Sequence, residues 1–267
     1  MTGQTVVITG AASGLGAGMA RAMSAKGARI ALLDRDTGSL DQVVADCPGS
    51  RGWAVDVTDA DGLARIAQEV AQHFGGIDAL VVCAGVGGGG LVLHGDPDAF
   101  ERILEINLMG SIRTTRAFLP HLVSAKGYVL QIASLAAFVP APMMGAYCAS
   151  KSGVEAFAHC LRAEVAHHGV DVGVAYLGFT DTQMVRTVDL DPVLGKMRAS
   201  MPWPFGVTRP AGPAVARLVR AVEGRKAHVY CPAWLRVMPW IRGAMPVLAA
   251  RQGRSHAHAA EDLLQQP

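Results

Sequence analysis

With 267 residues, 51% of them hydrophobic and 17% charged, the chain has the composition of a globular protein, because disordered chains show the reverse balance. Its formal net charge of +2 is too small for a basic surface that follows a phosphate backbone, which argues against nucleic acid as a partner. Glycine contributes 31 of the 267 residues, or 11.6%, whereas the ordinary share is about 7%. This excess predicts tight turns beneath a ligand.

Short apolar runs alternate with helix-like segments along the chain. The predicted strands are residues 5–9, 28–33, 52–57, 79–83, 128–133, 171–176 and 227–231. The predicted helices are residues 15–26, 39–46, 59–74, 97–124 (as two helices), 149–167 and 213–223. Apolar strands that alternate with single helices form parallel sheets covered on both faces. We therefore predict one α/β domain, a Rossmann-like, doubly wound parallel sheet of about seven strands with helices on both faces.

We place this domain at residues 1–251, including an apolar C-terminal segment at 232–251, and predict a disordered tail at 252–267. The chain begins without a basic or long apolar leader, and no stretch reaches 18 uninterrupted apolar residues, so neither a secretory signal nor a membrane-spanning helix is predicted. The five cysteines form no CxxC pair and the nine histidines no HExxH motif. We therefore expect free thiols, a cytoplasmic protein and no metal site.

The turn between the first predicted strand and helix is rich in glycine. It contains Gly10, Ser13, Gly14, Leu15 and Gly16, with the spacing G-x3-G-x-G. Glycines let the backbone approach a pyrophosphate closely, and the N-terminus of the following helix offers unpaired N–H groups to the phosphate charge. The position of this turn, in a βαβ unit at the start of the chain, predicts a dinucleotide site.

Two acidic positions at strand ends predict the adenosine side of that site. Asp34 lies eighteen residues beyond Gly16, where a carboxylate accepts hydrogen bonds from both ribose hydroxyls and repels a 2′-phosphate. The adjacent Arg35 is able to accommodate that phosphate, but the strand-end position of Asp34 favours NAD over NADP. Asp56 and Val57, at the end of the third strand, are expected to border the adenine, although a helix-capping role explains Asp56 as well.

Three further residues form a candidate acid–base centre. Tyr147 and Lys151 are four residues apart in a predicted helix, so they share one face. A nearby ammonium favours the phenolate, and we therefore expect the pKa of Tyr147 to be lowered towards the range of a general acid or base. Ser134 follows the fifth strand, where its hydroxyl would point into the ligand crevice at the carboxyl edge of the sheet.

Taken together, these residues resemble the classical short-chain dehydrogenase/reductase family over residues 3–235. The matching positions are the glycine turn of Thr9–Gly16, Asp34, Asp56–Val57, Asn107 within Glu105–Leu108, Ser134, and Tyr147 with Lys151. The resemblance implies hydride exchange between a nicotinamide and an alcohol or carbonyl carbon. It also implies a homodimer or homotetramer built on the helices after the fourth and fifth strands.

The same resemblance gives each catalytic residue a role. Tyr147 would exchange the hydroxyl proton, and Ser134 would hydrogen-bond the substrate oxygen. Lys151 would bind the nicotinamide ribose and lower the pKa of Tyr147. Asn107 would hold a water that links Lys151 to bulk solvent.

The sequence departs from the family pattern after the fourth strand. The family's Asn-Ala-Gly is Cys83-Ala84-Gly85 here, and a thiol cannot replace the amide hydrogen bonds that tie the central sheet together. We expect altered packing, with the backbone contacts of these three residues to the adenosine ribose retained.

A second departure follows the sixth strand, where the family's Pro-Gly is Leu177-Gly178. Gly178 and Thr180 are still expected to offer backbone groups to the nicotinamide carboxamide, and Thr182 its hydroxyl. Loss of the proline predicts a more flexible loop.

The predicted substrate is an apolar secondary alcohol or ketone, similar to a steroid, a terpene or a lipid. The candidate pocket segments 135–139, 142–144 and 201–205 are apolar and rich in methionine and aromatic residues. The segment 232–251 mixes Trp, Leu and Arg as interfacial segments do. This segment has three possible contacts: a membrane surface, a neighbouring subunit, or the pocket of its own chain.

Two other functions compete with an NAD-dependent dehydrogenase. One is an NADP-dependent carbonyl reductase, which Arg35 supports because an arginine can accommodate the 2′-phosphate. A non-catalytic nucleotide-binding redox sensor on the same fold is less favoured, because such proteins typically lack the Tyr, Lys or Ser that this chain retains.

Overall fold

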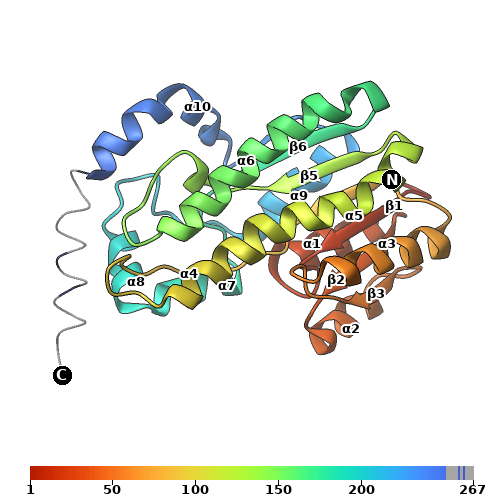
Figure 1. The fold of residues 1–267 in the computed structure, drawn as a ribbon, viewed down its shortest axis with the longest axis horizontal. Helices are drawn as coiled ribbons and strands as arrows, with labels where there is room; N and C mark the ends of the chain where they lie inside the picture. Colours follow the sequence, from red (N-terminus) through yellow and green to blue (C-terminus); the bar gives the residue numbers. More distant parts are fainter. Residues whose placement is uncertain (251–257, 259–260, 262–267) are drawn as a thin grey trace.

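A computed structural model describes residues 1–250, 258 and 261. These residues form a seven-stranded, entirely parallel sheet, as the sequence predicted, and its strand order is β3-β2-β1-β4-β5-β6-β7 (Figure 1). The strands are β1 (Thr5–Thr9), β2 (Arg29–Asp34), β3 (Arg51–Ala54), β4 (Ala79–Val82), β5 (Tyr128–Ile132), β6 (Asp171–Leu177) and β7 (His228–Cys231). The strand order reverses between β1 and β4, and ligands of doubly wound folds bind at that crevice.

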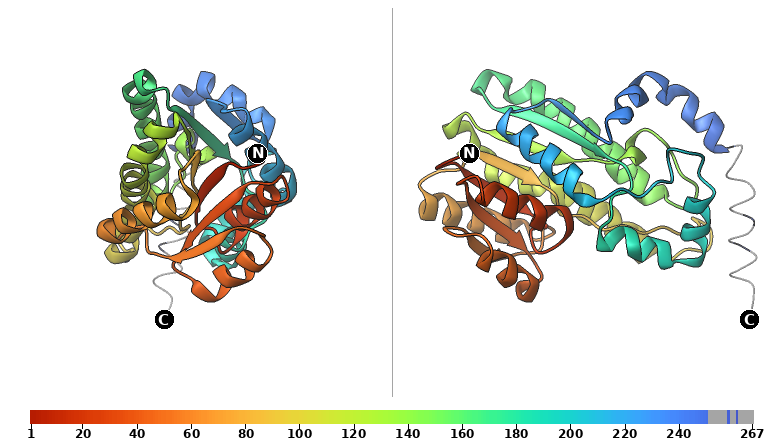
Figure 2. Two further views of the ribbon diagram at one scale, coloured as in Figure 1. Left: turned by 90° about the vertical axis from the view of Figure 1, so that its right-hand side faces the viewer. Right: turned by 180° about the vertical axis from the view of Figure 1, so that it is seen from behind.

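Helices cover both faces of the sheet (Figure 2). They are α1 (Gly14–Ser24), α2 (Thr37–Ala45), α3 (Ala60–Phe74), α4 (Pro97–Leu104), α5 (Gly110–Ala125), α6 (Gly145–Val165), α7 (Gln183–Leu190), α8 (Pro192–Ala199), α9 (Ala211–Glu223) and α10 (Met238–Ile241). Five short 3-10 or π-helical elements join them: η1 (Glu105–Met109), η2 (Leu135–Ala137), η3 (Ala166–His168), η4 (Ala233–Val237) and η5 (Arg242–Ala244).

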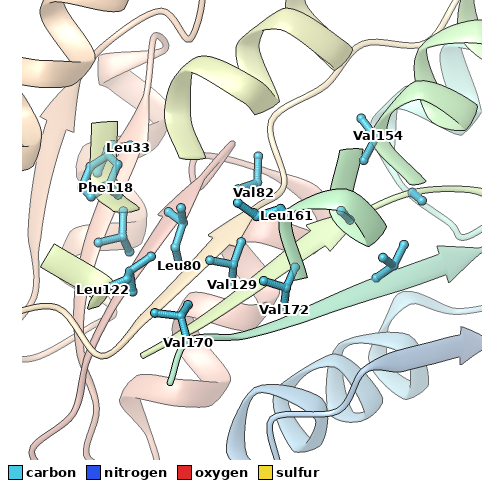
Figure 3. Packing of buried hydrophobic residues seen from close by; sticks show 14 of the residues in the cluster. Leu33, Leu80, Val82, Phe118, Leu122, Val129, Val154, Leu161, Val170 and Val172 are labelled. Atoms are coloured by element: carbon cyan, nitrogen blue, oxygen red, sulfur yellow. The ribbon is translucent and has the colours of Figure 1, made fainter. Parts of the chain in front are cut away.

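Alternation along the strands divides the buried residues into two cores. In β1, Val7 packs with residues of α3, α5 and α6, whereas Val6 and Ile8 pack with residues of α1, α2 and α9. Figure 3 shows the first of these cores, where Phe118 of α5 and Leu161 of α6 lie over the sheet. The central strands β1, β4 and β5 are therefore buried on both sides, which explains their nearly continuous apolar sequences, whereas the edge strand β3 is partly exposed.

Several predicted boundaries are corrected by tertiary pairing. The third strand was expected to reach residue 57, but β3 ends at Ala54, because Ala54 pairs with Asp34 and β2 ends there. The long helical stretch at 97–124 is α4 and α5 joined without a break by the π-helix η1, and Pro120 lies inside α5. The helices α7 and α8 were not predicted.

The chain continues beyond β7 into a segment that runs through η4, α10 and η5 to helical residues 245–250 (Figure 1). Leu235, Met238 and Met245 of this segment are buried in the first core, the one that contains Val7. Among the described residues, none of the helices is long and apolar enough to cross a bilayer. The predicted tail at 252–267 lies outside the described residues, apart from 258 and 261.

Candidate functional site

A cavity of about 280 Å³ opens at the carboxyl ends of the central strands. The structure brings together in its wall every residue for which a cofactor contact was predicted, along with Ser134. These residues are Gly10, Ser13, Gly14, Leu15, Gly16, Asp34, Arg35, Asp56, Val57, Cys83, Ala84, Gly85, Tyr147, Lys151, Gly178, Thr180 and Thr182. We refer to this space as the nucleotide cavity, for the ligand that its wall is expected to hold.

The glycine turn has the geometry that such a ligand needs. Gly10 adopts φ +67°, and a Cβ on it would lie 2.8 Å from the Cα of Ala84. A Cβ on Gly16 would lie 2.0 Å from the carbonyl oxygen of Gly10, so the turn closes without room for a side chain. Ser13 occupies the N-cap of α1 in an extended conformation, and its side chain makes no capping hydrogen bond. Because a helix leaves its first N–H groups without internal partners, this end of α1 fits a pyrophosphate.

The adenosine end carries a compact set of polar contacts. Asp34 accepts hydrogen bonds from the backbone N–H groups of Ala12 at 3.0 Å and Asp36 at 3.1 Å. The guanidinium of Arg35 lies 3.7 Å from a carboxylate oxygen of Asp56. Burial raises the pKa of Asp56, but hydrogen bonds from Thr58 and the charge of Arg35 outweigh it, and the pKa is lowered overall. Arg35 is thus paired with a carboxylate at the edge of the cavity.

The three candidate catalytic residues converge from neighbouring elements. Ser134 follows β5 as the N-cap of η2, where its hydroxyl oxygen accepts from the N–H of Ala136 at 3.2 Å. Tyr147 lies in the first turn of α6, and Lys151 follows one turn later. The Lys151 ammonium donates to the carbonyl of Ile132 at 3.0 Å and lies 5.9 Å from the centre of the Tyr147 ring.

The expected direction of the Tyr147 pKa is wrong. Burial raises the pKa of this phenol, and the hydrogen bond with Ser134 opposes the rise without reversing it. Burial also lowers the pKa of Lys151, to about 8. The charge of Lys151 alone would lower the pKa of Tyr147, but both groups also lose water on burial, and desolvation disfavours the charged form of each.

Asn107 does not line the nucleotide cavity but lies behind it, fully buried in η1. Its amide nitrogen donates to the carbonyl of Val86 at 3.0 Å and to the hydroxyl of Ser150 at 3.2 Å, and its oxygen accepts from the N–H of Val86 at 2.8 Å. The π-helical turn places this amide between the loop after β4 and α6. Its expected role in holding a water beside Lys151 stays a prediction.

The backbone at Cys83 is held by a residue of β1. The hydroxyl of Thr9 accepts hydrogen bonds from the N–H groups of Cys83 at 3.1 Å and Ala84 at 3.2 Å. Burial raises the pKa of the Cys83 thiol to about 11. Thr9 therefore ties the ends of β1 and β4 together, and Cys83 stays a neutral thiol near neutral pH.

A second, apolar cavity of about 510 Å³ adjoins the first. The residues that line both are Ser134, Tyr147, Leu177, Gly178, Met184 and Val185. The candidate acid–base groups Ser134 and Tyr147 thus lie at the junction, where a ligand in either cavity meets them. We call this space the apolar cavity.

The predicted pocket segments line the apolar cavity in part. Val139, Met144 and Phe205 contribute to its wall, as expected. Phe138 and Trp203 do not: the Phe138 ring packs against Tyr176 with centroids 4.5 Å apart, and Trp203 is 83% exposed. Leu135 and Ala136 of η2 line the cavity, whereas Phe138, which follows η2, packs in the core instead.

The opposite wall comes from α7 and α8, which were not predicted, and from the C-terminal segment, for which contact with the pocket was one of the open alternatives. Residues from these elements in the wall are Met184, Val185, Val188, Met197, Ile241, Met245, Leu248 and Ala249. The spacing of Met184, Val185 and Val188 is that of one helix face, and this pattern is the sequence signal that indicates the wall. The described residues contain no group of three or more His, Cys, Asp or Glu that could hold a metal ion.

Comparisons with known proteins agree with this architecture. Residues 4–192 match the family described as short chain dehydrogenase. The chain is 36% identical over 190 residues to "Dehydrogenase/reductase SDR family member 7B" of Bos taurus, an alignment that covers 67% of this chain and 58% of that protein. It is 34% identical over 192 residues to "Probable oxidoreductase EphD" of Mycobacterium tuberculosis, covering 69% of this chain and 32% of that protein. The chain thus spans less than two thirds of the length of these curated relatives.

Among solved structures, the crystal structure of gox2181 superimposes with a TM-score of 0.79 at 22% identity, covering 86% of this chain and 95% of that one. This likeness concerns the fold. The family match extends over most of the chain and includes the glycine turn, Ser134, Tyr147 and Lys151. The chain therefore belongs to the short-chain dehydrogenase/reductase family.

Proposed function

We propose that the protein is an NAD-dependent oxidoreductase that exchanges a hydride with the carbinol or carbonyl carbon of an apolar secondary alcohol or ketone. The observation that carries this proposal is the position of Ser134 and Tyr147, which line both the nucleotide cavity and the apolar cavity. A substrate oxygen bound between them would have its carbon directed at the neighbouring cavity. When bound, the nicotinamide accepts or delivers the hydride.

The chain's own residues supply proton transfer and charge stabilisation. In the oxidative direction Tyr147 takes the hydroxyl proton of the substrate, and in reduction it returns that proton. The Ser134 hydroxyl hydrogen-bonds the substrate oxygen and stabilises its developing charge. Lys151 holds a positive charge beside the Tyr147 ring at pH values below its pKa of about 8.

The preference for NAD is supported by the strand end of β2. Asp34 lines the nucleotide cavity, and its carboxylate would repel a 2′-phosphate. Arg35, the residue that supports an NADP-dependent carbonyl reductase instead, lies near Asp56 and is about half exposed. This pairing competes with phosphate binding and favours NAD.

The apolar cavity supports the substrate class. Its volume of about 510 Å³ lies in the range of cavities that hold drug-sized ligands. Methionine side chains such as Met144, Met184 and Met197 adapt to irregular apolar ligands, and burial supplies the binding free energy. A steroid-, terpene- or lipid-like alcohol fits these properties.

Cellular location and assembly form part of the same proposal. We place the protein in the cytoplasm, as a homodimer or homotetramer. We also infer a peripheral contact with membranes through the C-terminal segment, where Trp240 is 89% exposed.

The decisive experiment is a screen of NAD and NADP against steroid, terpene, short-chain and sugar alcohols. The absorbance of the reduced nicotinamide measures the rate of each reaction. We expect the highest kcat/KM with NAD and the bulky apolar alcohols. Tyr147→Phe should lower turnover by about 10²–10⁴ while NAD affinity, measured by fluorescence titration, stays nearly unchanged, because only the hydroxyl is lost. Wild-type turnover in Tyr147→Phe would contradict the acid–base assignment, and higher kcat/KM for sugars would contradict the substrate class.

A further inference from the structure

Besides its buried apolar residues, the C-terminal segment makes polar contacts with α6 and η2 through one arginine. Arg242, the first residue of η5, places its guanidinium nitrogens 3.1 and 3.3 Å from the two carboxylate oxygens of Glu155 in α6. The same guanidinium donates to the carbonyl of Ala137 in η2 at 3.3 Å and lies over the Phe138 ring, 5.3 Å from its centre. Arg242 thus contacts two elements that are remote from it in the sequence.

The carboxylate partner of Arg242 is buried, so its negative charge depends on nearby partners for stabilisation. The Glu155 side chain is 7% exposed. Its other neighbours are the hydroxyl of Tyr176, which donates at 3.0 Å, and the imidazole of His159 at 3.9 Å. Removal of one partner of a buried ion pair leaves an uncompensated charge. The Arg242 side chain is itself 46% exposed, so loss of its charge would weaken the contact between η5 and α6.

Arg242 also lies between two walls of the apolar cavity without lining it. On one side, its neighbour Ile241 and, further along, Met245 and Leu248 form part of the wall. On the other side, Ala137 ends η2, the turn that begins after Ser134 and whose first two residues line the cavity. The guanidinium therefore fixes the distance between the C-terminal wall and the turn that carries Ser134.

We infer that Arg242 is a positioning residue that determines substrate size, because with Glu155 and the Ala137 carbonyl it holds residues 241–249 as the wall of the apolar cavity. Bulky apolar substrates gain affinity by burial against this wall, whereas small alcohols bound between Ser134 and Tyr147 do not reach it. This inference rests on the proposed function and adds a determinant of specificity to it.

The test compares Arg242→Gln and Arg242→Lys with Arg236→Gln, a control in the same segment at an exposed position. In Arg242→Gln, we expect KM for a steroid-sized secondary alcohol to rise at least about tenfold, with kcat and the Kd for NAD changed less than about twofold. KM for cyclohexanol should stay unchanged, and Arg242→Lys should recover part of the loss. Equal rises of KM for both alcohols, or the same effect in Arg236→Gln, would overturn the inference.

A binding measurement separates this inference from the proposed function. The neutral dye N-phenyl-1-naphthylamine, whose fluorescence rises in apolar surroundings, should bind Arg242→Gln about tenfold more weakly than wild type or Arg236→Gln. If no alcohol is oxidised but this difference is found, the proposed function fails and the role of Arg242 stands. Equal dye affinities overturn that role.

Folding of the variants is controlled through the buried partner. If Arg242→Gln alone fails to fold by circular dichroism, the double variant Glu155→Gln/Arg242→Gln removes the uncompensated charge and should fold. The double variant should still bind the dye and the bulky alcohol about tenfold more weakly than wild type, because the guanidinium contact with Ala137 is lost. Wild-type affinity in the double variant would contradict the inference.

Discussion

At the scale of single residues, Asp34 combines two functions that a substitution can separate. Its carboxylate is expected to meet the adenosine ribose, and it also accepts hydrogen bonds from the N–H groups of Ala12 and Asp36. We expect the charge to decide between cofactors, whereas the acceptor oxygens hold the backbone at Ala12 and Asp36. A variant that keeps an acceptor but removes the charge therefore isolates the first function.

Asp34→Ala and Asp34→Asn should both weaken NAD and improve NADP, measured as kcat/KM for each cofactor. The reason is that the repulsion of a 2′-phosphate disappears while Arg35 remains. Asp34→Asn should lose less thermal stability than Asp34→Ala, because its amide oxygen still accepts a hydrogen bond. A wild-type preference for NADP would contradict the assignment of Asp34.

Burial of Lys151 makes a pH-dependent contribution to stability. Its pKa is about 8 in the folded chain against 10.5 for the free group, so between these values the unfolded chain binds more protons and this group's contribution to stability rises with pH. Below pH 8 the burial costs about 3 kcal/mol. The Lys151→Met variant lacks this pH-dependent contribution to stability.

The stability of Lys151→Met relative to wild type should therefore shrink as the pH rises from about 8 to about 10.5. Urea unfolding of both proteins across this range measures the difference. The lost hydrogen bond to Ile132 adds an offset that does not depend on pH. A difference that is constant with pH would show that Lys151 keeps its ordinary pKa.

At the scale of elements, the glycine turn joins β1 to α1 through a contact that leaves no room for a side chain. The hypothetical Cβ of Gly16 lies 2.0 Å from the Gly10 carbonyl oxygen, and that atom belongs to the backbone. Neither group can move without displacing β1 or α1. The phosphate-facing geometry and the packing of α1 therefore depend on the same residue.

Gly16→Ala should lower NAD affinity at least about tenfold and lower the Tm by several degrees, because the turn must open to accept a methyl group. Gly212→Ala is the matched control: its Cβ meets no atom within 4 Å in α9, so the change should be neutral or slightly stabilising. Calorimetry and cofactor titration measure both effects. Unchanged NAD affinity in Gly16→Ala would contradict the phosphate role of the turn.

The C-terminal segment illustrates how an element acquires two different faces. Ile241, Met245 and Leu248 line the apolar cavity, whereas Trp240 is exposed. The sequence showed the apolar and aromatic content but not this division. Of the uses left open for the segment, contact with the pocket of its own chain is observed, and membrane contact stays a proposal for the exposed face.

At the scale of the whole molecule, part of the wall of the apolar cavity and the exposed Trp240 belong to the same segment. The proposed membrane contact would therefore place the cavity near a source of lipid-like substrate. We expect the full chain to float with vesicles of phosphatidylcholine and phosphatidylglycerol, and Trp240→Ser to float less. Trp203→Ser removes another exposed tryptophan outside the segment and should float as wild type does. Absence of the wild-type protein from the vesicle fraction would contradict membrane contact.

The sequence by itself determined the parallel sheet and the positions of the candidate site, because both depend on local pattern. Apolar strands alternate with helices. At the carboxyl edge of the sheet, Gly10 and Ser134 come after strands, Asp34 ends one, and Tyr147 lies in the first turn of α6. In a doubly wound fold these positions converge whatever the intervening sequence is. The family resemblance carried the same information, and the seven-stranded topology of the described residues agrees with it.

Tertiary structure alone decided the properties that arise between elements. Burial reversed the expected pKa shift of Tyr147, because desolvation depends on which segments cover a group and not on its neighbours in the chain. The contact between Arg242 and Glu155 joins residues 87 positions apart, and the apolar cavity takes its walls from α6, α7, α8 and the C-terminal segment. Solvent exclusion and long-range packing are set by the arrangement of the whole chain, and no local pattern contains them.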